Sequence, residues 1–360
     1  MEMRKEDFGN DKRTAFEAKT EAQKIAFGPV MFQAARALVK LGILELLNKS
    51  GSSGISSRDI ADRLNISKYG AEVLLDAGLS MGIVRMQDEK YILTKTGFFI
   101  LNDSMTKVNM DFVHDVCYEP SFFLEESVRT GKPEGLKVFG NWKTIYPGLQ
   151  HLPEKAKKSW FGFDHYYSDV AFPEIIPLIA KDNPSTLMDV GGNTGKFAVQ
   201  CVTHIPGLEV TIVDLPDTLK AAEKNITEKG FGDKIHFFAA DMLDDKNDLP
   251  HGFDAIWMSQ FLDCFSEEQI HSILTRAVRS MDEQSSLYIL ELFWDRQKYE
   301  ASSYSLNATS LYFTCLANGN SRMYHSTDMF RMIEAAGLRI EESTDHIGIS
   351  HTLVKCRKQR

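Results

Sequence analysis

The chain has 360 residues, of which 43% are hydrophobic and 25% are charged, and its net charge is −9. These proportions are typical of globular proteins, and the length is sufficient for two domains. A net negative charge argues against nucleic acid as the main partner, and the apolar stretches are shorter than the roughly 18 residues of a membrane-spanning helix, so we expect a small-molecule ligand.

The first part of the chain combines helix signals with one hairpin signal. Residues 14–26 have helical potential, and apolar residues at helical spacing predict an amphipathic helix over 31–47. Two further helices, 58–64 and 69–81, each follow a serine that can cap them. Two short strands then flank a turn at 88–90. This order is typical of a winged helix.

Winged helices have two common uses. A DNA-reading helix would be basic, but the second helix carries Glu72 and Asp76 and no Arg or Lys from Tyr69 to Ser80. We therefore predict a helical, winged-helix dimerisation domain over residues 1–104. A ligand-sensing regulator that binds DNA remains the less favoured alternative.

Residues 105–180 are predicted to be helical and are rich in aromatic side chains. These side chains either pack between domains or line a lid over a flat aromatic ligand. We take the second interpretation as a prediction, so that this segment links the domains and lines a substrate pocket. The candidate pocket residues are Phe161, Phe163, His165, Tyr166 and Tyr167.

From Pro184 onward, apolar strand signals alternate with helix signals, which predicts a doubly wound parallel sheet in a domain over 181–360. The expected strands are 186–190, 209–213, 235–239, 255–259, 286–290, 338–342 and 347–354. The expected helices are 196–203, 218–229, 267–281 and 327–336.

The most informative motif is Asp189-Val-Gly-Gly-Asn-Thr-Gly195, which follows the first of these strands. The second strand ends at Asp214, 19 residues after Gly195. Glycines let a backbone approach a ligand closely, and an acid that ends the next strand can accept ribose hydroxyls. The pattern therefore predicts a nucleoside-containing ligand.

Three ligand classes compete for this turn. A P-loop needs a glycine five residues before Gly195 and a hydroxyl residue after Lys196, but the chain has Val190 and Phe197. A dinucleotide turn needs GxGxxG, but Asn193 and Lys196 occupy its second and third glycine positions. S-adenosylmethionine remains, because its turns tolerate a missing middle glycine.

Four motifs together resemble one known family. They are Asp189–Gly195, Val213–Pro216, Ala240–Met242 and Leu262–Glu268, and they fall in order at the expected spacings. They are similar to the plant-type and bacterial small-molecule O-methyltransferases, and the N-terminal half is similar to the dimerisation domain of that family. The resemblance implies a Rossmann-like class I methyltransferase domain with a mainly parallel seven-stranded sheet. It also implies a homodimer that methylates a small aromatic acceptor with S-adenosylmethionine.

The resemblance implies a set of cofactor contacts. In it, Gly191 holds the methionine moiety through its backbone, Asp214 accepts the ribose hydroxyls, and Asp241 accepts the adenine amino group. The full set of expected cofactor residues is Asp189, Gly191, Gly192, Gly195, Asp214, Leu215, Asp241, Met242, Ser259 and Gln260. Asp214 could instead cap the helix that follows it, and Asp241 could be an ordinary turn residue.

One position departs from the family pattern. The family has a histidine base in the segment where this chain reads Asp263-Cys-Phe-Ser-Glu-Glu268. Glu291 matches one carboxylate that orients the histidine in the family, whereas no acid stands between Ser321 and Tyr324 to match the other. The resemblance therefore assigns the catalytic position to Asp263, supported by Glu291.

An ordinary aspartate is a weak base for a phenol. Their pKa values, near ~4 and ~10, make the proton transfer uphill by roughly 8 kcal/mol. Three solutions are open: burial beside Glu291 raises the pKa of Asp263, the acceptor is itself acidic, or His165 or His325 supplies the base. Enzymes of the same fold that bind the cofactor and catalyse decarboxylation or hydroxylation are a further alternative.

The cysteines bear on the cellular compartment. Five of them are scattered along the chain without CxxC spacing, which indicates reduced thiols and neither a disulfide framework nor a metal site. We therefore predict a cytoplasmic protein without a metal ion.

Overall fold

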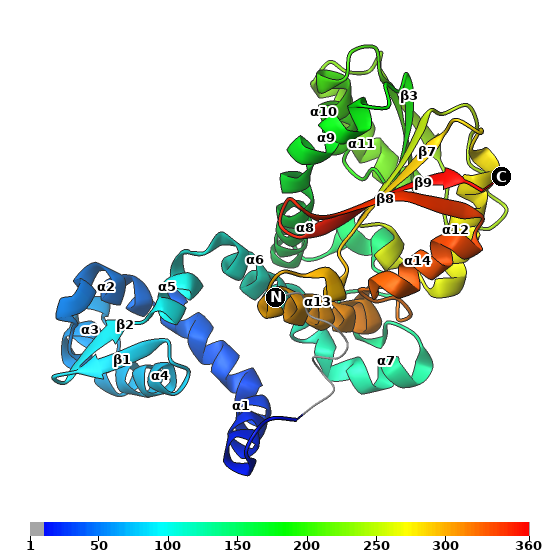
Figure 1. Cartoon of the computed structure of the whole chain (residues 1–360). Helices are drawn as coiled ribbons and strands as arrows, with labels where there is room; N and C mark the ends of the chain where they lie inside the picture. The colour runs from blue at the N-terminus through cyan, green and yellow to red at the C-terminus, as the bar shows by residue number, and fades with distance from the viewer. Residues whose placement is uncertain (1–10, 360) are drawn as a thin grey trace. The chain divides into compact units, whose positions relative to one another are not determined.

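The computed structural model describes residues 11–359, which form two compact units, 11–114 and 115–359 (Figure 1). Residues 1–10 and 360, at the ends of the predicted domains 1–104 and 181–360, lie outside the described residues. No helix within 11–359 is both long enough and apolar enough to cross a membrane.

The first unit is a set of helices around a small hairpin. Its elements are α1 (Ala15–Lys40), α2 (Ile43–Ser50), α3 (Ser57–Leu64), α4 (Lys68–Ser80), β1 (Val84–Gln87), β2 (Lys90–Leu93), α5 (Lys95–Asn102) and α6 (Ser104–Phe112). The predicted serine caps are present, because Ser56 and Ser67 accept the N–H groups of Asp59 and Gly70. Asp88 and Glu89 both have positive φ, which gives the two-residue turn that matches strand twist.

The predicted helix over 31–47 was wrong in its bounds. Helix α1 runs without a break through Pro29, and the chain breaks at Gly42, where φ is +80°. Gly42 adopts this left-handed conformation without a steric penalty, so it separates α1 from α2. The apolar periodicity that predicted one helix belongs to two helices that pack into the same core.

The second unit contains a seven-stranded sheet within the described residues, in the order β5-β4-β3-β6-β7-β9-β8. Its strands are β3 (Thr186–Val190), β4 (Glu209–Asp214), β5 (Ile235–Ala239), β6 (Ala255–Ser259), β7 (Ser286–Glu291), β8 (Leu338–Ile347) and β9 (His351–Lys358). The first five pair in parallel, and β9 pairs antiparallel with β7 and β8. The predicted fold class is confirmed.

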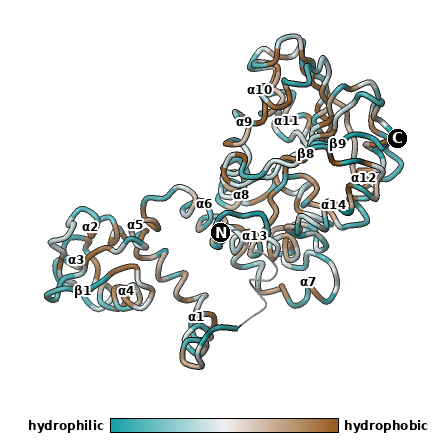
Figure 2. Tube along the Cα trace, in the orientation of Figure 1, coloured by the Kyte–Doolittle hydropathy of each residue, from teal (hydrophilic) through white to brown (hydrophobic). Residues whose placement is uncertain are grey.

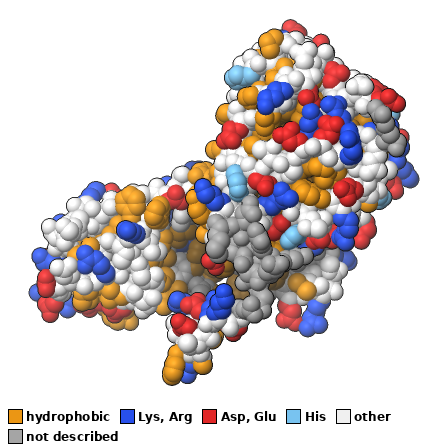
Figure 3. Space-filling model, viewed as in Figure 1, with side chains coloured by type: hydrophobic (Ala, Val, Ile, Leu, Met, Phe, Trp, Pro, Cys, Tyr) orange, Lys and Arg blue, Asp and Glu red, His pale blue; other side chains and the backbone are white. Residues whose placement is uncertain are grey.

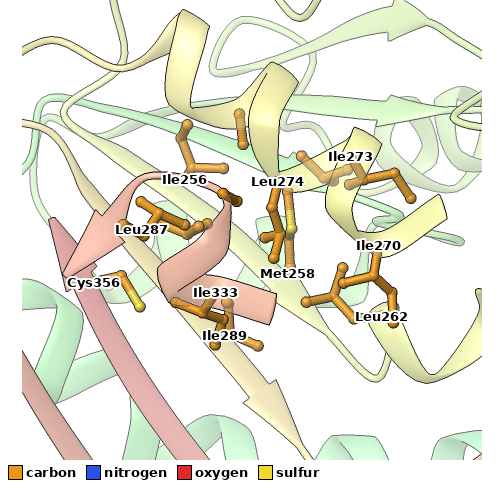
Figure 4. Packing of buried hydrophobic residues seen from close by; sticks show 14 of the residues in the cluster. Ile256, Met258, Leu262, Ile270, Ile273, Leu274, Leu287, Ile289, Ile333 and Cys356 are labelled. Carbon is orange, nitrogen blue, oxygen red and sulfur yellow. The ribbon is translucent and has the colours of Figure 1, made fainter. Parts of the chain in front are cut away.

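Helices cover both faces of this sheet (Figure 1). One core packs the sheet against α9 (Phe172–Ala180), α10 (Lys196–His204) and α11 (Pro216–Glu228). The other packs it against α12 (Glu267–Ser280) and α14 (Ser326–Ala335), as Figure 4 shows for Ile256, Leu274 and Ile333. Adjacent strand residues alternate between the two cores, as the two-residue period of a strand requires.

The hydropathy of the chain follows the same layers. Figure 2 shows hydrophobic and hydrophilic stretches alternating along the tube, and the buried hydrophobic residues belong to the two cores on either side of the sheet. Charged side chains of both signs are interspersed on the visible surface of each unit (Figure 3).

The remaining α-helices of the second unit, within the described residues, are α7 (Leu124–Thr130), α8 (Glu154–Ser168) and α13 (Glu300–Tyr312). The sequence analysis missed α13 and misplaced the last strand, which was expected over 347–354. Strand β8 continues to Ile347, and the chain turns at Gly348, where φ is +57°. A run rich in β-branched residues reads as one strand, although it spans the end of one strand, the turn and the next strand.

Candidate cofactor and acceptor site

The glycine turn joins β3 to α10, and the space around its glycines is too small for a side chain. Gly191 has φ of +78°, and a Cβ there would lie 2.4 Å from Cδ2 of Phe261. A Cβ on Gly192 would lie 2.7 Å from Oδ2 of Asp189. These glycines therefore allow the turn to pack closely against Phe261 and Asp189.

Asp214, at the carboxyl end of β4, is tied to this turn. Its Oδ2 accepts the N–H of Asn193 at 2.9 Å, and its Oδ1 accepts the N–H of Leu215 at 2.7 Å. Burial raises the pKa of Asp214, and these hydrogen bonds, together with one from the Thr218 side chain, oppose the rise. The residue at the N-cap position of α11 is Leu215, so Asp214 is not the N-cap of that helix.

Two neighbouring strands bring unpartnered polar atoms to the same edge of the sheet. Oδ2 of Asp189, on β3, and Oγ of Ser259, at the end of β6, are buried and have no hydrogen-bond partner among the described residues. Burial, together with the charge of Asp214, raises the pKa of Asp189 to about 8. Buried polar groups are normally satisfied, so these atoms indicate a missing partner.

These features fit S-adenosylmethionine. The amino acid end of that molecule is an ammonium donor, which matches the unpartnered carboxylate oxygen of Asp189. The ribose hydroxyls need an acceptor near the turn, which Asp214 provides.

The residues expected to contact the adenine have ordinary structural roles in the described chain. Oδ1 of Asp241 accepts the N–H of Leu243 at 2.9 Å, so this exposed carboxylate does form the ordinary turn that was the alternative. Met242 is buried in the core beside α12. Gln260 has φ of +46° and donates its N–H to Leu290 O at 2.8 Å. The contacts of Asp241, Met242 and Gln260 with adenine remain predictions.

Asp263 lies in a 3₁₀ turn, η8 (Leu262–Cys264), that follows β6 and is held from three sides. Oε1 of Glu291 accepts the N–H groups of Phe261 and Leu262 at 3.0 and 2.8 Å. Nδ2 of Asn318 donates to the carbonyl of Cys264 at 2.6 Å, and Oη of Tyr324 donates to the carbonyl of Phe265 at 2.7 Å. The backbone that carries Asp263 is therefore fixed.

Glu291 and Asp263 form a buried carboxyl pair, with 1% and 5% of their surfaces exposed. Burial raises the pKa of Asp263 to about 6. Burial and the charge of Asp263 raise the pKa of Glu291 well above its usual range. Like charges in a low dielectric disfavour double ionisation, so the pair holds one proton over a range of pH in which two isolated carboxyl groups would both be ionised.

The two alternative histidines differ in their surroundings. His325 caps α14, because its Nδ1 accepts the N–H of Thr327 at 3.2 Å, and its Nε2 lies 3.5 Å from Oδ2 of Asp295. His165 lies on α8, where its Nε2 is buried without a hydrogen-bond partner among the described residues and burial lowers the pKa of the ring. His325 is thus engaged in local structure, whereas His165 is available as a neutral base.

Helix α8 carries all five predicted pocket residues, and each is half-buried. The rings of Phe163 and Tyr167, one turn apart, pack in a tilted arrangement with centres at 5.0 Å, and those of Phe161 and His165 do so at 5.8 Å. Their contact with an acceptor remains a prediction.

The sequence analysis missed two groups on which the charge of Asp263 acts, and it missed a hydrogen bond between α8 and α13. Trp160 Nε1 donates to Oη of Tyr312 at 2.7 Å. The charge of Asp263 raises the pKa of both Tyr146 and Asp164, so these groups lie close to it. An acid inside the aromatic run of α8 was the signal that could have identified Asp164.

Models of known protein families match parts of both units. Residues 19–91 match the model of the Dimerisation2-like domain, and residues 123–339 match that of the O-methyltransferase domain. Among curated proteins, the chain is 25% identical to an L-tyrosine C(3)-methyltransferase of Streptomyces lavendulae, over 74% of this chain and 72% of that protein. It is 27% identical to a 3-hydroxy-5-methyl-1-naphthoate 3-O-methyltransferase of Streptomyces sahachiroi, over 76% and 77%.

Solved structures share the fold. The S-adenosylmethionine-dependent methyltransferase SibL superposes with a TM-score of 0.70 at 24% identity, over 94% of this chain and 98% of that one. Human N-acetylserotonin methyltransferase in complex with SAM gives 0.65 at 19% identity, over 98% and 100%.

Proposed function

Because this chain belongs to the O-methyltransferase family and is an S-adenosylmethionine-dependent methyltransferase, we propose that it methylates a hydroxyl oxygen of a small aromatic acceptor and that Asp263 is the general base. The observation that carries the proposal is the buried Asp263–Glu291 pair, held on a fixed backbone after β6. Such a pair gives Asp263 a basicity that an exposed aspartate lacks.

The cofactor supplies an electrophilic methyl group on a sulfonium. In our proposal, the glycine turn of Gly191, Gly192 and Gly195 and the carboxylate of Asp189 hold the methionine end. Asp214 accepts the ribose hydroxyls, and Leu215, Asp241, Met242, Ser259 and Gln260 surround the rest. The unpartnered oxygens of Asp189 and Ser259 support this arrangement.

The raised pKa of Asp263 reduces the difference in pKa between the base and the hydroxyl of the acceptor. With a base near pH 6, proton transfer from a phenol of pKa ~10 is uphill by about four units, or about 5 kcal/mol. Alignment of the acceptor with the methyl group supplies roughly 7–11 kcal/mol in favourable cases. We therefore expect an acceptor whose hydroxyl is more acidic than that of a simple phenol.

The relatives make methylation at carbon the second candidate. One of them is named for methylation of a ring carbon of L-tyrosine, and another for a naphthoate hydroxyl. Removal of a phenolic proton activates both the oxygen and the neighbouring ring carbon, so the same base serves either reaction. NMR of the product separates them, because an O-methyl and an aryl methyl group have different carbon shifts.

The test is turnover of methyl-labelled S-adenosylmethionine with a panel of phenols, catechols and aromatic acids. We expect label in one product together with an equal amount of S-adenosylhomocysteine. The Asp263→Asn variant should lose about 10²-fold or more in kcat, as expected for a lost general base. A fully active Asp263→Asn enzyme would contradict the assignment and point to His165 or to an acceptor that is already ionised.

We further propose that the chain acts as a cytoplasmic homodimer assembled through its N-terminal domain, residues 1–104. The match to the Dimerisation2-like domain supports this assembly. In the same proposal, residues 105–180 line the acceptor pocket and residues 181–360 bind the cofactor.

A further inference from the structure

A buried arginine of α12, Arg276, contacts the loop that joins β5 to β6. Only 2% of its surface is exposed, and its Nη2 donates to the carbonyl of Met242 at 2.7 Å. Its Nη1 donates to the carbonyls of Asn247 and Asp244 at 2.9 and 3.1 Å. One guanidinium therefore ties three separate points of this loop, residues 240–254, to α12.

Main-chain carbonyls take the place of a carboxylate partner for this cation. Within the described residues, the side-chain nitrogens of Arg276 donate to carbonyls alone, the fourth being that of Ser272 in its own helix at 3.4 Å. A buried charge is costly unless its donors are satisfied. A guanidinium has five N–H donors in a planar fork, whereas an ammonium is a compact point charge with three. The arrangement therefore depends on the shape of arginine as well as on its charge.

The loop carries Asp241, the expected acceptor for the adenine amino group. The main-chain oxygen of Asp241 accepts the N–H of Asp244 at 3.1 Å and Nδ2 of Asn247 at 3.2 Å. The residues that hold Asp241 are thus the same two whose carbonyls Arg276 binds. Because Oδ1 of Asp241 accepts the N–H of Leu243 at 2.9 Å, Oδ2 is the oxygen that can accept an amino group.

Apolar packing fixes the two ends of this segment and leaves its middle to hydrogen bonds. Met242 and Leu249 are buried in the core beside α12, whereas the residues between them are exposed or half-buried. Exposed backbone with few apolar contacts opens at a low cost in free energy. Two of the carbonyls that Arg276 binds lie in this exposed stretch. The hydrogen bonds of Arg276 therefore anchor the middle of the loop, as the core anchors its ends.

From these contacts, and resting on the adenine contact of Asp241 in the proposed function, we propose that Arg276 is a positioning residue for cofactor recognition. It holds the loop in the conformation in which Asp241 can accept the adenine amino group. In this role Arg276 touches neither the cofactor nor the reacting atoms. It determines how well the enzyme distinguishes adenine from a purine without the amino group.

The effect of Arg276 should be confined to the adenine end of the cofactor. Ala240 donates its N–H to the carbonyl of Asp214 at 3.0 Å, so the start of the loop is tied to the ribose residue without Arg276. Arg276 acts further along, from Met242 onward. A change at Arg276 should therefore weaken the contact of Asp241 and leave those of the ribose and the methionine moiety in place.

The test compares S-adenosylhomocysteine with its 6-deamino analogue, in which hydrogen replaces the amino group of adenine. Calorimetry measures both dissociation constants on the full-length enzyme. We expect the wild-type enzyme to prefer S-adenosylhomocysteine by about tenfold or more, as for a hydrogen bond to a charged acceptor. Arg276→Lys keeps the charge and loses the fork, so it should reduce this preference to about threefold or less.

The matched control is Arg279→Lys, the same substitution one turn later on α12. Arg279 contacts Asp248 of the same loop at 2.6 Å, through a side chain that is 54% exposed. This variant should keep the full preference for the amino group. A merely structural role of Arg276 would lower the fraction of enzyme that binds either compound and would leave the ratio of the two dissociation constants unchanged.

The outcomes separate this inference from the proposed function. A preference that is lost in Asp241→Ala but kept in Arg276→Lys overturns the inference and keeps the adenine contact. A preference that survives in Asp241→Ala, or equal binding of both compounds by the wild-type enzyme, rejects the contact and the inference together. The expected binding pattern without methyl transfer to any acceptor keeps the inference and rejects the proposed reaction.

A second variant covers the case in which Arg276→Lys does not fold. Arg276→Gln retains two N–H donors on a planar group and should likewise reduce the preference to about threefold or less. Failure of both variants to fold would show that Arg276 supports the whole domain, and it would overturn a role confined to the loop.

Discussion

Oδ2 of Asp214 accepts the N–H of Asn193 at 2.9 Å and so joins the end of β4 to the glycine turn. Asn193 has φ of +49°, a conformation that asparagine tolerates better than most residues. The carboxylate therefore shapes the turn in addition to offering acceptors to a ligand. Replacement of Asp214 should therefore weaken the contacts of a bound cofactor with the glycine turn and those with its ribose.

Replacement of Asp214 by Ala should weaken the binding of S-adenosylmethionine by about 100-fold or more. The variant loses the acceptor for the ribose hydroxyls, and each hydrogen bond to a charged group contributes about 1.5–3 kcal/mol. Calorimetry measures the affinity, and Asp217→Ala is the control, because Asp217 forms its ion pair with the exposed Lys220 at 2.8 Å. Wild-type affinity in Asp214→Ala would remove the proposed ribose role.

Replacement of Gly191 by Ala should abolish cofactor binding and lower stability. The new Cβ would lie 2.4 Å from the ring of Phe261, at φ of +78°. Gly207→Ala separates the two effects, because Gly207 has the same φ of +78° with nothing within 4 Å. We expect Gly207→Ala to lose only about 1 kcal/mol of stability and to bind the cofactor normally. Equal effects of the two variants would show that close packing at the turn is unimportant.

The sequence predicted those parts of the fold that depend on local signals. The apolar runs at 186–190, 235–239 and 255–259 match β3, β5 and β6 in full, because each is short and is followed by a polar residue or a turn. The serine before α12, Ser266, forms a capping box with Gln269, which is a local sequence signal of the same kind. The break at Gly42 and the turn at Gly348 were missed, because apolar periodicity continues across them.

The site was predictable only where a motif marks it. Spacing and resemblance predicted the glycine turn, Asp214, Asp263 and Glu291, and their roles in binding and catalysis stay predictions. Tyr146 and Asp164, whose pKa values are raised by the charge of Asp263, were missed, because no local pattern records which distant segments of the chain fold together. The raised pKa of Asp263 likewise depends on burial, which the residue type alone does not show.

The pH dependence of the reaction should report the titration of the Asp263–Glu291 pair. Because burial raises the pKa of Asp263 to about 6, the basic form is scarce at low pH. We expect kcat/KM to rise about tenfold per pH unit below about pH 6 and then to level off. Initial rates between pH 4.5 and 8 measure this, and Asp263→Asn should lose the rising limb. A wild-type profile that is flat below pH 6 would contradict a base at this position.

Asp263→Asn should stabilise the enzyme at alkaline pH although it removes activity. The folded pKa of Asp263, about 6, lies above its unfolded value near ~3.9, so ionisation disfavours the fold. The contribution of this group to the stability of the wild-type protein is therefore fully present below about pH 4 and is lost as the pH rises through about 6. The amide side chain of the variant cannot ionise and avoids this loss.

The expected gain is about 3 kcal/mol at pH 8 and about half of that at pH 5, less the cost of any hydrogen bond that the amide fails to make. Chemical denaturation of both proteins at the two pH values measures the difference, with the exposed Asp217→Asn as a control that should show no gain. A gain that is equal at pH 5 and pH 8 would mean that Asp263 does not titrate in this range in the folded protein. The base assignment would then fail together with the stability argument, because both depend on the same ionisation.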